Sequence, residues 1–237
     1  MANSIKMFGF MVRQITKEAM MILLLIAPFL AGSLFKFGIP MAEKYICSYF
    51  GFTECISPYY DLFDWLLAIL IGMLFAFVGG LVSLGEIDDK LTMYYSGTPG
   101  GKLGYILSRI VYPAVLSGVA ALLLIPVFSI GNLRLLNLFV MVISAVLSGI
   151  VTALLVIAIS SNKVEGMAVG KLAGGFGAVF FIPLIVKGYV GYIFSPFPMY
   201  WIGKFTFEVS NSWYLVAALI LFAIWIVGLY KMFAKKI

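Results

Sequence analysis

Six long apolar runs alternate with short polar segments along this chain of 237 residues. The runs lie at about residues 19–35, 62–84, 105–130, 135–159, 167–186 and 213–230. Each is close to the roughly 20 apolar residues that a helix needs to cross the hydrocarbon of a bilayer. The runs are unbroken rather than alternating, which argues against a membrane barrel. The pattern therefore predicts an all-α integral membrane protein with six transmembrane helices, in a single domain over residues 1–237.

The composition supports this class. Hydrophobic residues make up 63% of the chain, charged residues 11%, and the mean hydropathy is +1.11. A soluble domain carries roughly 25% charged residues, so most of the surface of this chain must face lipid. The first run could instead be a signal peptide, because basic residues precede it, but its length favours a transmembrane helix.

Residues 1–18 have the spacing of an amphipathic helix. One side carries Ile5, Phe8, Met11, Val12 and Ile15, and the other carries Lys6, Arg13 and Lys17. A basic amphipathic helix with aromatic residues is typical of a segment in the plane of the membrane interface. The alternative is that it continues the first transmembrane helix without a break.

Two segments on one side of the membrane are apolar but interrupted. Gly38, Ile39 and Pro40 are expected to end the first helix, and the aromatic residues up to Tyr60 are expected to form a short cap at the headgroups. Residues 187–212 are rich in aromatics and too broken by Gly and Pro to span. They predict a re-entrant or interfacial element before the sixth helix.

The distribution of basic residues predicts the orientation. With both termini cytoplasmic, eleven of the 16 Lys and Arg residues lie inside and five outside, as the positive-inside rule favours. We expect a multi-pass protein of the cell (plasma) membrane. The two cysteines, Cys47 and Cys55, then share the first external loop, where an oxidising exterior favours a disulfide; the alternative is two free thiols.

The chain lacks the residues that several kinds of chemistry require. The chain has no histidine, which excludes Ser–His and Cys–His nucleophiles and argues against a metal site. The stretch from Gly97 to Lys102 fails as a phosphate loop, because Ser96 and Leu103 stand where Gly and Ser or Thr are required. No charge lies well inside the apolar runs, unlike in ion-coupled carriers. Energy from another subunit and an apolar or amphipathic substrate are therefore favoured.

Small residues recur every four positions in two of the runs. They are Gly72, Ala76 and Gly80 in the second, and Gly166, Gly170 and Gly174 in the fifth. This spacing lets helices approach closely in a bilayer. Packing within one subunit and an interface between subunits explain it equally well.

The segment between the second and third runs, residues 85–104, is densely polar. It combines an acidic cluster with a Thr-Pro break and a basic start of the next run: Glu86, Asp88, Asp89, Lys90, Leu91, Thr98, Pro99 and Arg109. An acidic pair could bind a metal, but a solvated helix end is the more ordinary interpretation. In its order of elements the whole chain resembles the permease subunit of type 2 ATP-binding-cassette (ABC) exporters. Ala27-Pro28 and residues 198–201 are similar to the same family, whereas Gly100-Gly101 departs from its usual polar pair.

The resemblance implies an exporter powered by a separate ATPase. Residues 85–104 would contain a coupling helix on the ATPase, with contacts from Glu86, Asp88, Asp89, Lys90, Leu91, Tyr94 and Tyr95. The pathway would run along the second and fifth helices, past Phe75, Phe77, Phe176, Phe180 and Phe181. The implied partners are two copies of an ABC ATPase, a second permease of the same or a homologous kind, and membrane lipid, but no nucleic acid.

The implied substrate is a drug, peptide or lipid that moves outward. ATP and Mg would be bound by the ATPase, and this chain would bind no cofactor and catalyse no reaction. A non-transporting membrane scaffold or assembly factor is the alternative function, and an intramembrane enzyme is a third.

Overall fold

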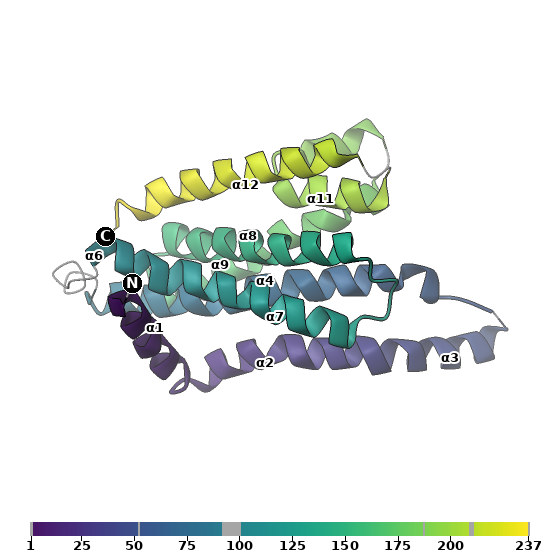
Figure 1. Ribbon diagram of the computed structural model, residues 1–237, viewed down its shortest axis with the longest axis horizontal. Helices are drawn as coiled ribbons and strands as arrows, with labels where there is room; N and C mark the ends of the chain where they lie inside the picture. The colour runs from purple at the N-terminus through teal and green to yellow at the C-terminus, as the bar shows by residue number, and fades with distance from the viewer. Residues whose placement is uncertain (1, 52, 92–100, 187, 209–210, 237) are drawn as a thin grey trace.

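The computed structural model describes residues 2–51, 53–91, 101–186, 188–208 and 211–236, and within these ranges the chain is helical without a strand. Six helices in the described part are long and apolar enough to cross a membrane. They run over Ala19–Phe50, Ser57–Asp88, Leu103–Phe128, Leu135–Ile159, Lys163–Ile185 and Ser212–Phe233. The six runs and the all-α class predicted from the sequence are confirmed (Figure 1).

The helix α4 (Tyr60–Asp88) lies at the centre of the bundle and contacts α2 (Ala19–Ser33), α7 (Tyr112–Phe128), α8 (Leu135–Ile159) and α9 (Lys163–Ala178). Its closest approach is to α8. A Cβ on Gly72 would lie 2.5 Å from the carbonyl oxygen of Ala145, and a Cβ on Gly149 would lie 2.8 Å from that of Gly72. Glycine on both helices allows this contact. The small residues of the second run therefore serve packing within this chain.

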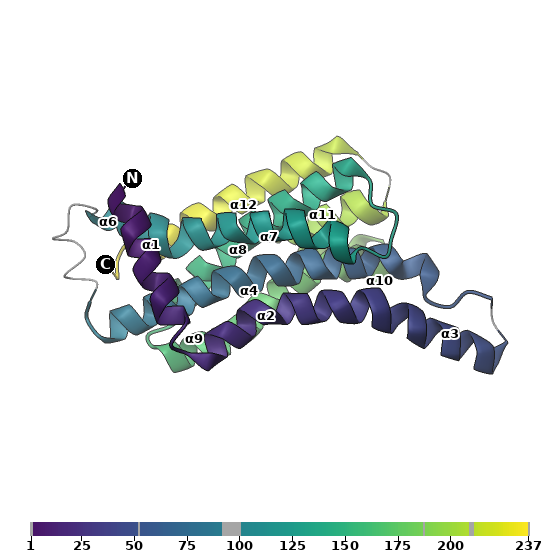
Figure 2. The ribbon, with the colours of Figure 1, turned by 60° about the horizontal axis from the view of Figure 1, so that its bottom comes forward.

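The first transmembrane helix differs from its prediction. α1 (Ala2–Ile15) is separate from α2, so it does not continue the first crossing. However, Gly38 and Pro40 do not end that crossing: a π-helical turn at Leu34–Gly38 leads into α3 (Ile39–Phe50), which projects beyond the bundle (Figure 2). Pro40 follows the π-helical turn, and local π-helical adjustments of this kind let a membrane helix accommodate a proline. The expected short cap is thus a helical arm.

The last part of the chain packs beside the bundle. The short helices α10 (Ile182–Ile185) and α11 (Pro198–Phe207) flank a 3₁₀ turn at Tyr189–Phe194. α11 contacts α12 (Ser212–Phe233) and buries Met199, Tyr200 and Ile202. Ten residues rise about 15 Å, so α11 alone is too short to span. Whether it enters the membrane as a re-entrant element stays a prediction.

The loop between α7 and α8 is fixed by carboxylates from the start of α4. Asp64, which is 3% exposed, accepts hydrogen bonds from the Ser129 hydroxyl at 2.5 Å and the Gly131 N–H at 3.2 Å. Asp61 accepts one from the N–H of Asn132 at 3.0 Å. The carboxylates therefore satisfy backbone donors that lie between two helices. The third and fourth transmembrane helices pack against each other through α7 and α8, and the loop between them is fixed to α4.

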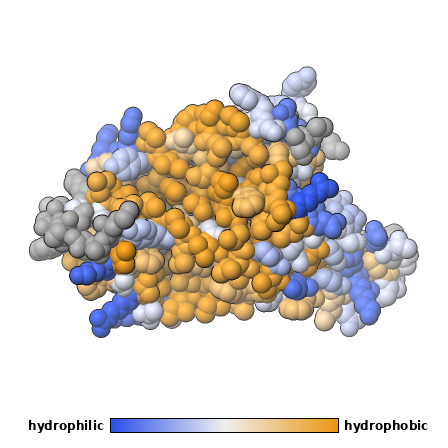
Figure 3. Space-filling view, in the orientation of Figure 1, coloured by the Kyte–Doolittle hydropathy of each residue, from blue (hydrophilic) through white to orange (hydrophobic). Residues whose placement is uncertain are grey.

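Both chain termini lie at the same end of the bundle, which also carries α6 (Gly101–Ile106) (Figure 1). We call this the terminal end; α3 projects from the opposite end (Figure 2). Hydrophobic residues form a broad zone between two ends that carry hydrophilic residues (Figure 3). This is the surface expected of a chain whose middle faces lipid.

Candidate functional site

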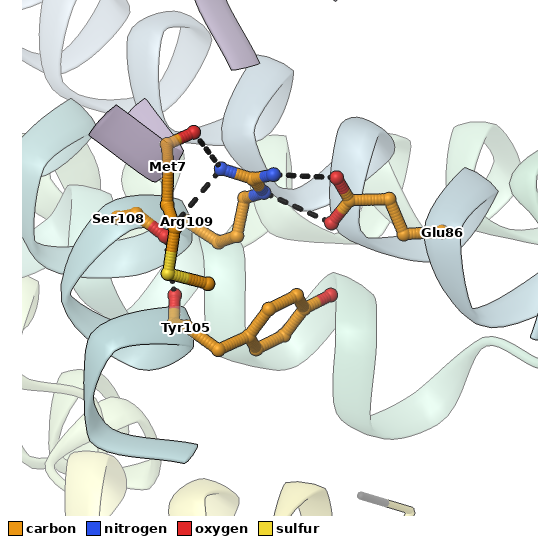
Figure 4. Close-up of polar contacts among 5 residues, drawn as sticks. All are labelled: Met7, Glu86, Tyr105, Ser108 and Arg109. Atoms are coloured by element: carbon orange, nitrogen blue, oxygen red, sulfur yellow. Dashed lines mark hydrogen bonds and ion pairs between the residues drawn. The ribbon is translucent and has the colours of Figure 1, made fainter. Parts of the chain in front are cut away.

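A buried ion pair joins the two helices that flank the polar segment 85–104. Arg109 lies in a π-helical turn at Leu107–Val111, and Glu86 lies in the last turn of α4. Their charged groups are 2.5 Å apart from Nη2 to Oε1 and 2.9 Å from Nε to Oε2 (Figure 4). The two side chains are each 1% exposed. The pair is bidentate, the geometry in which a guanidinium binds a carboxylate most strongly.

The same guanidinium reaches a third element. Arg109 Nη1 donates to the carbonyl oxygen of Met7 in α1 at 2.7 Å (Figure 4). Removing either charged partner would leave an uncompensated buried charge, which is strongly destabilising. Glu86, Arg109 and the Met7 carbonyl thus form a clamp that ties α1 to both ends of the polar segment. We call this group the three-helix clamp.

The predicted role of Glu86 does not fit this position. A side chain that contacts an ATPase would be exposed, whereas Glu86 is 1% exposed and is buried within the chain. Its partner, Arg109, is 23 residues away in the sequence, beyond a segment with Gly and Pro, so no helical spacing relates the two residues. The only sign of this pair in the sequence is the basic residue at the start of the third run, which we used to predict the orientation of the chain in the membrane.

The other predicted coupling residues divide into three groups. Asp88, Asp89 and Lys90 are exposed at the end of α4, and Leu91 is half-buried. Asp88 also accepts a hydrogen bond from the N–H of Lys163, at the start of α9, at 3.1 Å. Tyr94 and Tyr95 lie outside the described residues. The exposed charges therefore stand next to the three-helix clamp, on the surface of the terminal end.

The predicted pathway residues do not share one surface. Phe180 is fully buried and stacks on Trp65 with ring centroids 4.7 Å apart. The remaining members are divided: Phe176 packs on Phe197 and Trp225, Phe181 packs edge-on against Phe180, Phe75 faces α1 and α2, and Phe77 faces α9. Phe75 and Phe77 lie on different sides of α4 in this structure. The role of the five residues in a pathway between two permeases stays a prediction.

Phe77 lines a cavity of about 220 Å³ between α4, α8 and α9. Most of its wall is apolar, and two polar side chains converge on it: Thr152 and Lys171. The Thr152 hydroxyl is buried without a hydrogen-bond partner in the described structure, and Lys171 is exposed. The remaining wall is formed by Leu70, Met73, Leu74, Met167, Gly170 and Gly174. An apolar cavity with a few convergent polar groups is typical of a small-molecule site.

The two cysteines lie together near the outer end of the projecting arm, Cys47 in the last turn of α3 and Cys55 in the segment that follows it. Their Sγ atoms are 3.2 Å apart, and both are free thiols in this structure. A disulfide requires about 2.05 Å, so a small movement would join them. Glu43 holds the adjoining turn by accepting the N–H groups of Ile56 and Ser57, each at 2.8 Å. The predicted disulfide stays a prediction, now with the two sulfurs within reach.

Comparison with known proteins identifies a family. The family of the fluoroquinolones export permease protein Rv2686c-like matches residues 11–232, a range that covers the six transmembrane helices except for Phe233, the last residue of the sixth. No curated protein and no solved structure matches this chain. Within the described residues no group of three or more His, Cys, Asp or Glu could hold a metal ion. The six-helix bundle, its polar terminal end and this match agree: the chain belongs to the Rv2686c-like family of export permeases.

Proposed function

We propose that this chain, as one transmembrane domain, is the permease subunit of an ABC exporter in the plasma membrane. The observation that carries the proposal is the match to an export permease family over residues 11–232. The described residues add six apolar helices and little polar structure beyond them. Such a chain provides a route through the membrane. The energy for transport comes from hydrolysis of ATP, which separate ATPase subunits bind together with Mg.

The terminal end is the cytoplasmic side in this proposal, and residues 85–104 dock on the ATPase. Asp89 and Lys90 are exposed there and supply charged contacts, which set specificity and orientation at such an interface. Glu86 does not touch the ATPase; through Arg109 it fixes the segment to α1 and to the third helix. A displacement of this segment by the ATPase would then move the three helices of the clamp together. Two ATPase copies and a second permease, the same or homologous, complete the exporter.

The cavity between α4, α8 and α9 is the proposed substrate contact. A fluoroquinolone is a flat aromatic ring system with a carboxylate, and the name of the family makes it the first substrate to test. Phe77 would stack on the rings, Lys171 would attract the carboxylate, and the free Thr152 hydroxyl would donate to it. The cavity is small for a whole drug, so the outer part of the ligand would lie against lipid or a second permease.

The test begins with affinity purification of the chain in mild detergent and reconstitution of the complex in proteoliposomes. We expect an ABC ATPase to copurify and norfloxacin transport to require ATP. Lys171→Gln and Thr152→Val should each raise KM about tenfold, the effect of losing one hydrogen bond to a charged group. The matched control is Lys231→Gln, an exposed lysine on α12 that lies outside the cavity. A preparation without a nucleotide-binding partner, even after crosslinking, would contradict the proposal and favour a scaffold.

A further inference from the structure

A second hollow lies at the terminal end of the bundle. It has a volume of about 90 Å³ and is bounded by α1, α4, α9 and the start of α2. Polar side chains make up much of its lining: Gln14, Glu18, Glu86, Asp89 and Lys163. We call this hollow the polar vestibule. The transport proposed above does not yet assign it a role.

The polar vestibule and the cavity between α4, α8 and α9 follow one another along the same two helix faces. On α9, Met167 and Lys171 line the cavity, and Lys163, one turn before Met167, lines the polar vestibule. On α4, the same spacing leads from Phe77 in the cavity to Leu81 in the polar vestibule. Side chains that are four residues apart lie on one face of a helix. The two hollows are therefore successive sections of one groove between α4 and α9.

A thin apolar layer separates the two sections. Met167 packs against the buried cluster that contains Met21 and Leu81. At the same level a Cβ on Gly166 would lie 2.3 Å from Cδ1 of Leu84, so the backbone of α9 rests directly on α4. Four residues of helix, or about 6 Å, separate the vestibule residue of α9 from the cavity residue Met167. A small displacement of the start of α9 is therefore enough to join the two sections.

The start of α9 is held by two contacts of a single residue. The ammonium of Lys163 forms an ion pair with Glu18, which directly precedes α2, and the N–H of Lys163 donates to Asp88 at 3.1 Å (Figure 2). The side chains of Glu18 and Lys163 are 43% and 27% exposed. An ion pair this exposed adds little to stability, whereas breaking the buried pair of the three-helix clamp is strongly unfavourable. The Glu18–Lys163 pair is therefore a contact that separates at low cost.

We propose that the Glu18–Lys163 ion pair is a latch on the route by which substrate reaches the cavity from the terminal end. When the pair separates, the start of α9 moves away from α2 and α4, and the polar vestibule becomes continuous with the cavity. The charged end of an amphipathic substrate would then lie among polar groups, where its burial costs least. Asp88 belongs to the segment that docks on the ATPase in the proposal above, so movement of that segment would also displace Lys163. The substrate rests on the proposed function, and the latch rests on this chain alone.

The test measures how fast Met167→Cys reacts with methanethiosulfonate reagents that do not cross the membrane. Cys47 and Cys55 are first replaced by Ser, and reaction of Lys90→Cys identifies the vesicles whose terminal end faces the reagent. Two reagents of similar size and opposite charge are compared. Glu18→Gln should raise the rate for both reagents about two- to fivefold, the effect of one surface ion pair on the population of the open state. A change of local charge without opening would instead favour the anionic reagent and slow the cationic one.

Reversal of the ion pair provides the second measurement. Glu18→Lys with Lys163→Glu should restore the slow reaction with both reagents. The matched control is Glu208→Gln, which removes the partner of Lys204 in an exposed ion pair at the opposite end and should leave the rate unchanged.

Equal rates in Glu18→Gln and the unmodified pair would overturn the latch, and so would rates that change in opposite directions for the two reagents. A cysteine at position 167 that reacts only from the side opposite the terminal end would overturn the route. Neither ATP nor a drug is present in this experiment. Failure of the exporter proposal would therefore leave its outcome unchanged, and the two results are distinguishable.

Discussion

The three-helix clamp makes a prediction about stability that a double-mutant cycle can test. Glu86→Leu and Arg109→Met each remove one charge and keep a side chain of roughly similar volume. Each single variant leaves the other charge buried without the opposite charge of the ion pair, since both positions are 1% exposed. Such a loss costs about 3–5 kcal/mol of unfolding free energy. Independent effects would sum to about 6–10 kcal/mol in the double variant.

The clamp predicts a different value for the double variant. Replacing both partners of a buried ion pair by apolar residues is often neutral. The double variant does lose the hydrogen bond from the charged Arg109 to the Met7 carbonyl, worth about 1.5–3 kcal/mol. We therefore expect its unfolding free energy to fall within about 3 kcal/mol of that of the unmodified chain. Backbone exchange in α1 should nevertheless rise, because its tie to the third helix is gone.

The assay is reversible unfolding in mixed detergent micelles, with hydrogen exchange to follow α1. Asp89→Leu with Lys90→Met is the matched control, because both residues are exposed at the end of the same helix. Surface changes of this kind stay within about 0.5 kcal/mol. Single variants at Glu86 and Arg109 that also stay within that range would refute the reasoning. A double variant as unstable as the sum of the singles would refute it equally.

Three further predictions concern packing and the arm. Gly72→Leu should prevent stable folding, because its Cβ would meet the backbone of Ala145. Gly174→Leu should be tolerated, because a Cβ there meets nothing within 4 Å. Size-exclusion chromatography in detergent distinguishes the folded variant from the misfolded one. Asp64→Asn should lower the unfolding free energy by about 1.5–3 kcal/mol, the value of hydrogen bonds to a charged acceptor, and hydrogen exchange in residues 129–134 should rise. Mild oxidation should join Cys47 to Cys55 within one chain, which mass spectrometry detects as a loss of two hydrogens; full alkylation of both thiols after oxidation would contradict it.

The sequence predicts the six transmembrane helices, but it does not predict which side of each helix packs against which neighbour. Six apolar runs predict six helices because lipid leaves the backbone no other partner, and the spacing of Gly72 and Ala76 predicted a closely packed face. The predicted end of the first helix is wrong, because the helix continues past Pro40 through the π-helical turn at Leu34–Gly38. The sequence pattern around a proline does not show whether such a turn will accommodate it.

The site shows the same division. The sequence shows a polar segment between the second and third helices, but it does not show that Glu86 is buried. That burial depends on Arg109, 23 residues away, whose guanidinium also binds the backbone carbonyl of Met7. The pathway residues Phe75 and Phe77 are two positions apart on one helix, and so face different neighbours. Their separation depends on how α4 is rotated within the bundle. That rotation is set by its contacts with α8.

The most direct test of the exporter proposal is site-specific photocrosslinking in intact membranes, with a crosslinking amino acid at Lys90 or at Lys44. Lys90 is exposed at the terminal end beside the three-helix clamp, and Lys44 is exposed on the projecting arm at the opposite end. The proposal predicts that position 90 crosslinks to an ABC ATPase and that position 44 does not. The absence of an ATPase crosslink at position 90, or an ATPase crosslink at position 44 alone, would contradict the exporter proposal.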